Sequence, residues 1–135
     1  MQLEIQHVEI HVSSLEKAKA FYVGQLELEI LDEMPELNLL ALKAGNVRIS
    51  IFGGYEPNLN ADKKTGTHLI FRTINLSETI EKLKAKGVTF KGDVFEAPGF
   101  IRDIATTDPD GNIVEFAEYL RDPLKPNPIK LQELS

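Results

Sequence analysis

Two histidines and one glutamate in this chain of 135 residues have the types and positions that could bind a metal ion. His7 and His68 each open a short run in which apolar and polar residues alternate, and Glu115 lies in a third such run after a turn at 108–111. Burying an isolated imidazole or carboxylate is unfavourable, so a cluster of the three requires a compensating partner. Two neutral imidazoles and one carboxylate leave open positions on a divalent cation, which favours a catalytic site. We therefore expect His7, His68 and Glu115 to bind one metal ion.

The chain contains no cysteine, which excludes disulfides, thiolate ligands and a cysteine nucleophile. The expected ion is therefore held by nitrogen and oxygen, and Fe, Mn, Ni, Co and Zn all remain possible. A single histidine on the inner face of a sheet is more often a structural residue than a ligand. The metal prediction depends on the agreement of three positions, and the alternative is a site without a metal.

Four further polar residues are expected on the inner faces of the strands. Glu9 could act as a general base and His11 could orient a substrate oxyanion, or the two could simply hydrogen-bond at the mouth of a cleft. Arg48 and Arg72 could each bind an anionic substrate through two hydrogen bonds, or could neutralise nearby glutamates. The sequence alone leaves these alternatives open.

Hydrophobic periodicity predicts one helix and four strands in the first half of the chain. Residues 3–12 alternate as a strand does, and the period then lengthens to that of a helix, with capping residues at 13–14 and Gly24 at its end. Three strands follow, around one turn at 33–35 and another at 45–46. Their expected bounds are Leu26–Leu31, Leu37–Leu42 and Val47–Phe52.

The same order of elements returns in the second half. A strand is expected at His68–Thr73, followed by a helix at Leu76–Lys86 that Gly87 ends. Three strands complete this half, and the turn at 108–111 joins the last two. Their expected bounds are Val88–Phe90, Ile101–Thr106 and Ile113–Tyr119.

The interval from His7 to His68 equals the interval from Leu15 to Leu76, so both halves keep the same spacing between first strand and helix. Such internal symmetry indicates a duplicated module. The expected fold is α+β, with two tandem βαβββ modules whose mixed sheets form an open, barrel-like cleft. We expect a single domain at 1–120, with modules at 1–53 and 66–120, a linker at 54–65 and a tail at 121–135.

Each helix must cover one face of its sheet, so the wholly apolar face of each strand is expected beneath the helix and the other face is expected to line the cleft. The covered positions are Val8, Ile10, Val12, Val47, Ile49, Ile51, Leu69, Phe71, Val114 and Phe116. The positions that face the cleft are His7, Glu9, His11, Arg48, Ser50, Phe52, His68, Ile70, Arg72, Ile113 and Glu115. The cleft is therefore expected to be polar.

The net charge of −6 and the absence of a basic run offer nothing complementary to a phosphate backbone, so nucleic acid is not an expected partner. The first residues lack the features of a signal peptide, and no stretch is long and apolar enough to span a bilayer. These features predict a soluble, cytoplasmic protein that does not bind membranes. A chain of this length has room for one domain with its own core.

The first strand and helix carry the pattern His-Val-x-x-x-Val followed by Leu-Glu-Lys-Ala-x-x-Phe-Tyr, and the last turn and strand carry Asp-Pro-Asp-Gly-x-x-x-Glu-Phe. In these motifs the sequence resembles the vicinal oxygen chelate superfamily, the glyoxalase, bleomycin-resistance and extradiol-dioxygenase group, over residues 3–120. The resemblance implies paired modules around a metal site with His7, His68 and Glu115 as ligands. It also implies a homodimer, and His7 could meet the other two ligands within one chain or across the dimer.

Glyoxalase I and methylmalonyl-CoA epimerase relatives typically carry Glu or Gln at a fourth ligand position. The matching residue here is Ser50, or Ile49 if the position is counted from the preceding turn. Neither is a strong ligand, so three ligands are expected, as in the fosfomycin-modifying and extradiol-dioxygenase branches. Ser50 is expected to contact the substrate, together with Arg48 and Arg72.

The implied function is that of a metal-dependent, glyoxalase-like lyase or isomerase. Its small substrate would offer carbonyl or diol oxygens to the ion, which acts as a Lewis acid and stabilises an enediolate or oxyanion. One alternative is an extradiol-dioxygenase or fosfomycin-modifying relative. Another is a metal-free protein of the bleomycin-resistance type that sequesters a cationic ligand, which the acidic net charge also suits. The intact set of two histidines and a glutamate favours the enzyme, because a sequestering protein would not need it.

Overall fold

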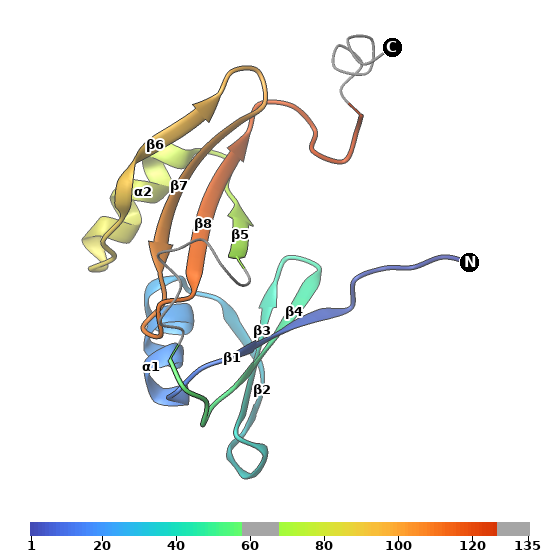
Figure 1. The fold of residues 1–135 in the computed structure, drawn as a ribbon, viewed down its shortest axis with the longest axis vertical. Helices are drawn as coiled ribbons and strands as arrows, with labels where there is room; N and C mark the ends of the chain where they lie inside the picture. Colours follow the sequence, from blue (N-terminus) through green and yellow to red (C-terminus); the bar gives the residue numbers. More distant parts are fainter. Residues whose placement is uncertain (58–67, 127–135) are drawn as a thin grey trace.

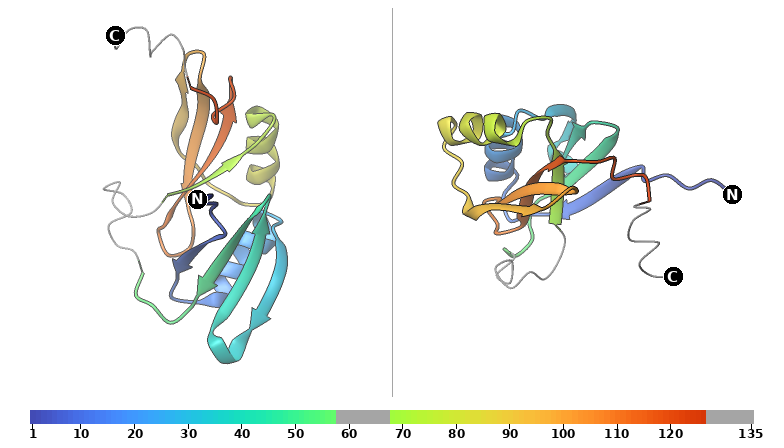
Figure 2. Two further views of the ribbon diagram at one scale, coloured as in Figure 1. Left: turned by 90° about the vertical axis from the view of Figure 1, so that its right-hand side faces the viewer. Right: turned by 90° about the horizontal axis from the view of Figure 1, so that it is seen from above.

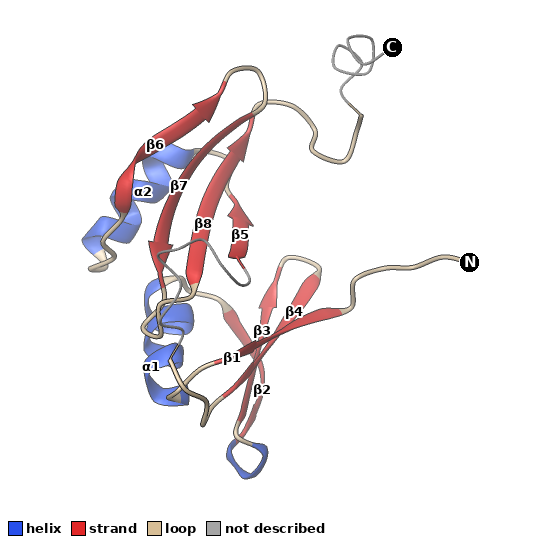
Figure 3. Cartoon of the chain, viewed as in Figure 1, coloured by secondary structure: helices blue, strands red, loops and turns tan. Residues whose placement is uncertain are grey.

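The computed structural model describes residues 1–57 and 68–126, which form two four-stranded sheets with few helices (Figure 3). The first module contains β1 (His7–His11), α1 (Leu15–Lys19), the π-helical turn η1 (Ala20–Gln25), β2 (Glu29–Met34), the 3-10 turn η2 (Pro35–Leu37), β3 (Leu39–Ala44) and β4 (Val47–Phe52). The second contains β5 (His68–Arg72), α2 (Leu76–Ala85), β6 (Lys91–Ala97), β7 (Ile101–Thr107) and β8 (Ile113–Tyr119). The α+β fold is confirmed. The expected linker and tail lie largely in 58–67 and 127–135, outside the described residues.

The two sheets repeat one topology. The strand order is β1-β4-β3-β2 in one sheet and β5-β8-β7-β6 in the other. In each, the first strand pairs in parallel with the last strand of its module, so that His7 is opposite Arg48 and His68 is opposite Ile113. Within the described residues, β1 and β5 therefore lie at sheet edges and have a partner strand on one side only.

One face of each sheet packs into a common core, as the alternation of residues predicted. Figure 1 shows α2 against the second sheet and α1 near the junction of the modules. The side chains that were expected beneath the helices are buried or partly buried, whereas His7, Glu9 and His11 on the other face of β1 are exposed. Among the helices of the described residues, none is long and apolar enough to cross a membrane.

Several predicted bounds were wrong. The predicted strand at Val88–Phe90 is not one, because Val88 is buried in the core and Phe90 packs against it, and pairing with β7 begins only at Lys91. The strands β2 and β3 begin two to three residues later than predicted, since Pro35 opens a 3-10 turn that ends at a left-handed Asn38. Gly24 does not end the first helix, which continues as a π-helical turn to Gln25.

The modules are joined through the turn between β7 and β8. The Tyr22 hydroxyl donates to Asp108 Oδ2 at 2.8 Å, and Asp110 accepts hydrogen bonds from the backbone N–H and the hydroxyl of Ser13. Asp108 also accepts from the backbone N–H groups of Asp110 and Asn112 and so closes its own turn. These bonds fix the end-to-end arrangement of the modules that the left view of Figure 2 shows.

Candidate functional site

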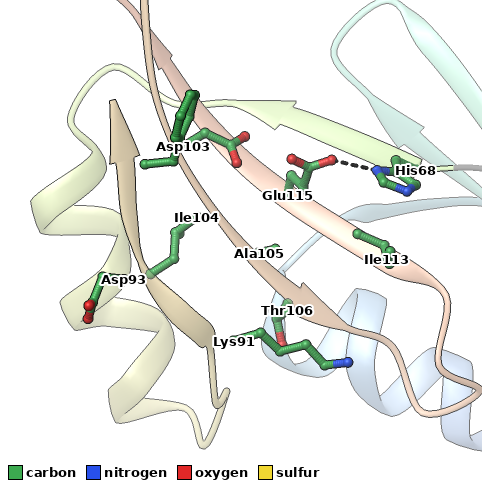
Figure 4. A pocket seen from close by; sticks show the side chains of 10 residues that line it. His68, Lys91, Asp93, Asp103, Ile104, Ala105, Thr106, Ile113 and Glu115 are labelled. Atoms are coloured by element: carbon green, nitrogen blue, oxygen red, sulfur yellow. Dashed lines mark hydrogen bonds and ion pairs between the residues drawn. The ribbon is translucent and has the colours of Figure 1, made fainter. Parts of the chain in front are cut away.

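His68 and Glu115 meet on the concave face of the second sheet. His68 begins β5, and Glu115 lies on the neighbouring strand β8, opposite Ile70. The two side chains point toward one another (Figure 4), with 2.9 Å between His68 Nδ1 and Glu115 Oε2. They are 30% and 19% exposed, respectively, so both are partly shielded but open to a ligand. The structure thus brings together two of the three predicted ligands.

Asp103 of β7 is a third member of this cluster, and the sequence reasoning missed it. Burial, a hydrogen bond to Glu115 and the negative charge of Glu115 raise the pKa of Asp103 to about 7, while the nearby His68 lowers it. Asp103 therefore holds a proton more readily than an ordinary aspartate. Its position alternates with the buried Ile104, which places an acidic residue on the cleft face of a strand. That alternation is the signal that could have identified it.

The cluster lines a cavity of about 450 Å³ on the concave side of β6, β7 and β8. Its walls combine acidic groups, one lysine, one exposed aromatic ring and small or aliphatic side chains, namely His68, Lys91, Asp93, Phe95, Asp103, Ile104, Ala105, Thr106, Ile113 and Glu115. Ala105 lies opposite Glu115 in the strand register, so its small side chain leaves space in front of the carboxylate. A small organic molecule fits this volume.

His7 does not join His68 and Glu115 within the described residues. It lies on β1 of the other sheet and is exposed. No group of three or more His, Cys, Asp or Glu side chains in residues 1–57 and 68–126 is arranged to hold a metal ion. One chain therefore offers an imidazole nitrogen and a carboxylate oxygen side by side, a donor pair that suits a first-row divalent ion but leaves it short of protein ligands.

Glu9 and His11 form a pair on the exposed face of β1. His11 Nε2 lies 2.6 Å from Glu9 Oε2, and the two side chains are 44% and 49% exposed, respectively. Tyr55 stacks on the His11 ring, with 4.0 Å between centroids and 8° between planes. No pattern in the sequence indicates Tyr55, because it lies in the loop after β4, where no periodicity operates. The hydrogen-bonded arrangement expected for Glu9 and His11 is present.

Arg48 and Ser50 of β4 are engaged with each other. Arg48 Nη1 donates to Asp32 Oδ2 at 2.8 Å, and Arg48 Nε donates to Ser50 Oγ at 3.3 Å. The strand register places Ser50 opposite Glu9, which is the position in the first module that Glu115 holds in the second. Ser50 rather than Ile49 is therefore the counterpart of Glu115, and it is only 5% exposed.

Arg72 differs from Arg48 in having no counter-ion in the part of the chain that the structure describes. It is exposed at the end of β5, and neither a hydrogen bond nor an ion pair reaches it from the described residues. The alternative that it neutralises Glu115 is wrong for this chain, since Glu115 interacts with His68 and Asp103 instead. Within residues 1–57 and 68–126, the Arg72 guanidinium is therefore not engaged by an acidic group.

Comparison with known proteins identifies a family and several solved structures that this chain resembles. The sequence pattern of the Glyoxalase/Bleomycin resistance protein/Dioxygenase superfamily matches residues 4–116. A glyoxalase family protein from Enterococcus faecalis is 30% identical, with 85% of this chain and 97% of that chain covered and a TM-score of 0.69.

Two solved structures of lower identity show the same fold. Lactoylglutathione lyase from Agrobacterium tumefaciens is 21% identical, with 85% of this chain and 92% of that chain covered and a TM-score of 0.67. An antibiotic binding protein from Streptomyces sp. CB03234 is 22% identical, with 87% and 97% covered and a TM-score of 0.68. An enzyme and a binding protein thus share this architecture, so the fold alone does not separate the two functions.

Proposed function

The chain belongs to the glyoxalase/bleomycin resistance protein/dioxygenase superfamily, and from this premise we propose that it is a metal-dependent, glyoxalase-like lyase or isomerase. Its substrate is a small molecule with carbonyl or diol oxygens. The observation that carries the proposal is the approach of His68 Nδ1 to Glu115 Oε2 at 2.9 Å in the wall of a cavity of about 450 Å³.

His68 and Glu115 are two ligands of the proposed site, and His7 of a second copy of the chain is the third. His7 is exposed on an edge strand and does not reach His68 within the described residues of one chain. A symmetric dimer places the first module of one copy against the second module of the other, so it contains two equivalent sites. A homodimer is therefore part of the proposal.

A bound divalent ion supplies Lewis acidity, which polarises a substrate oxygen and stabilises negative charge that develops on it. The residues of the chain supply orientation and proton transfer. Glu9 Oε2, 2.6 Å from His11 Nε2, accepts a proton from the substrate, and His11 shares that proton through the existing contact. Both lie on the same face of β1 as His7, so the three enter the site together. Ser50 and Arg48 line the same sheet beside Glu9.

Metal analysis tests the site. The purified chain is reloaded with Fe, Mn, Ni, Co or Zn under reducing conditions and its metal content is measured by plasma mass spectrometry. The parent is expected to hold about one equivalent per chain, and the His7→Ala, His68→Ala and Glu115→Gln variants are expected to lose it. His11→Ala is the matched control, because it removes an imidazole that is not a ligand and should keep its metal.

Mixing two inactive variants tests the placement of His7. His7→Ala and His68→Ala chains are unfolded together, refolded as a mixture and reloaded. A heterodimer then contains one intact site, with His7 from one chain and His68 from the other, so about a quarter of the parent metal content should return. A site built within one chain predicts no recovery in the same experiment, and that result would refute the shared site.

A second function is favoured by the cavity lining. Asp93, Asp103 and Glu115 surround the same space as the aromatic ring of Phe95, which is 63% exposed. Carboxylates beside an aromatic face suit an organic cation. The similar antibiotic binding protein shows that a protein with this fold can bind a small organic molecule. If a folded parent takes up none of the five metals, the enzyme proposal fails. Equilibrium binding of cationic aromatic compounds then tests sequestration.

A further inference from the structure

We propose that Arg72 and the segment at 120–124 form a subsite for the anionic group of an organic ligand, either a carboxylate or a phosphate ester. The subsite is inferred from the geometry of the second module. That it binds the end of the substrate remote from the reaction rests on the proposed function, which places the reacting oxygens at His68 and Glu115.

A cavity of about 630 Å³ opens at the end of β5 and β8, separate from the cavity around Glu115. Arg72, Tyr119 and Arg121 line it, together with Ile70 and the rest of the segment at 120–124. Two arginines thus line one space, and Asp122 is the acidic residue among those that line it. Asp122 Oδ1 already accepts a hydrogen bond from the backbone N–H of Leu124 at 2.9 Å. The balance of charge in this cavity favours an anion.

Arg72 is distinguished by comparison with the other three arginines of the chain. Arg48 binds Asp32, and Arg102 lies 3.3 Å from Glu96. Arg121 donates to backbone carbonyls at 122 and 125. Arg72 has no such acceptor among the described residues. Its five N–H donors are therefore available to a carboxylate or a phosphate, the groups that a guanidinium binds through two parallel hydrogen bonds.

Arg121 is the second arginine that lines this cavity, and its own contacts hold it in place. Its guanidinium lies over the Phe100 ring at 4.4 Å from the centroid, and its bonds to the carbonyls of Asp122 and Lys125 fix the turn of the following segment. Its Nε is buried and has no hydrogen-bond partner in the described part of the chain. A buried unsatisfied donor is uncommon in native structures. Arg121 thus adds a fixed positive charge to the wall, whereas Arg72 is not held by any described residue.

The position of the subsite defines the shape of its ligand. His68, Ile70 and Arg72 alternate along the cleft face of β5, which puts Arg72 roughly 13 Å along the strand from His68 at about 3.3 Å per residue. Ile70 lies between them and is 52% exposed. Arg72 is opposite the buried Ala117, whose small side chain leaves room beside it. The matching ligand has an oxygen-rich head at Glu115, an apolar body over Ile70 and an anionic end at Arg72.

Calorimetric titration of the full chain with simple probes tests the subsite. Hexyl phosphate and hexanoate present the two anionic groups on the same apolar body, and hexanol is the neutral counterpart. The parent is expected to bind at least one anion and not hexanol. The anion that binds more tightly shows whether the subsite prefers a phosphate ester or a carboxylate. Arg72→Gln should weaken that binding roughly tenfold or more, and Arg72→Lys should recover part of it. Arg102→Gln, which removes a paired arginine from the other face of the sheet, should bind as the parent does.

Two results would overturn the subsite. One is binding of neither anion at millimolar concentration by the parent, or equal binding by the parent and Arg72→Gln. The other is a fall in dimer content on sedimentation of Arg72→Gln with unchanged anion affinity, which would assign Arg72 to a contact between copies. Metal content is measured on the same samples. Anion binding without metal would refute the enzyme proposal and leave the subsite intact. Metal binding without anion binding would refute the subsite and leave the enzyme proposal intact.

Discussion

The hydroxyl of Tyr22 donates a 2.8 Å hydrogen bond to the carboxylate of Asp108, which lies 86 residues further along the chain and in the other module. Tyr22 is fully buried and Asp108 is 3% exposed. A buried bond to a charged acceptor contributes more than an ordinary one. The same turn leads directly into β8, so the contact that joins the modules also sets the start of the strand that carries Glu115.

Tyr22→Phe is expected to lower the free energy of unfolding by about 2 kcal/mol, because it leaves one buried carboxylate oxygen with a single donor from Asn112. Urea unfolding followed by circular dichroism measures the change. Tyr55→Phe is the matched control, since Tyr55 is 48% exposed and contacts His11 through its ring. Equal stability of Tyr22→Phe and the parent would show that the contact between modules contributes little.

Asp103→Asn is expected to stabilise the protein increasingly between pH 4 and pH 7. Folding raises the pKa of Asp103 from its ordinary 3.8 to about 7, so across this window the folded chain keeps a proton that the unfolded chain has released. The contribution of Asp103 to the stability of the parent therefore falls as the pH rises, whereas asparagine has no proton to lose.

The gain for Asp103→Asn should level off above pH 7 at about 1–2 kcal/mol, a figure reduced for the solvent screening of a half-exposed group. Urea unfolding at several pH values measures it. Asp93→Asn, which changes an exposed carboxylate in the same cavity, is the control. Parallel curves for the parent and Asp103→Asn would contradict the prediction.

Ser50→Glu is expected to tighten metal binding by about tenfold if the proposed site exists, because it puts a carboxylate at the position that corresponds to Glu115. Arg48, which already donates to Ser50, is placed to offset the added charge. Competition with a chelator of known affinity measures the change, and Ser50→Ala separates it from loss of the hydroxyl. Affinity equal to that of Ser50→Ala would mean that position 50 does not face the ion.

Gly87→Ala is expected to cost about 1 kcal/mol of stability, since Gly87 ends α2 with a left-handed φ of +90°. Gly24→Ala is the control, because Gly24 is within a helical turn and has open space where a Cβ would stand. Thermal unfolding of the two variants compares them directly. A larger loss for Gly24→Ala than for Gly87→Ala would refute the assignment.

The sequence was most informative where local pattern and burial agree. Strand β8 has the bounds that its alternation predicted, and helix α2 begins at the predicted Leu76. The strand β6 could not be predicted, because Lys91–Ala97 is largely exposed and has no apolar face to reveal it. The residues before it, Val88–Phe90, were predicted as a strand because Val88 and Phe90 are apolar, but these two side chains pack in the core without strand pairing.

The candidate site was predictable in part for a similar reason. Alternation placed His68 and Glu115 on the cleft-facing side of their strands, and the expected metal cluster brought them together, whereas the pairing of β5 with β8 is seen only in the structure. Asp103 was missed because an acidic residue within a strand has no motif of its own. The location of His7 relative to them depends on how whole modules pack, and no local pattern encodes that arrangement.

The burial of Tyr22 also allows the junction between the modules to be followed by the ultraviolet absorbance of tyrosine. Burial and the adjacent Asp108 carboxylate raise the pKa of the Tyr22 hydroxyl far above its ordinary value of 10.0, and the chain has three tyrosines and no tryptophan to obscure their absorbance. In alkaline solution the ultraviolet signal of tyrosinate from Tyr22 is therefore expected to develop as the junction between the modules opens. A spectrophotometer can follow the opening of this junction in the unmodified protein, without an attached dye.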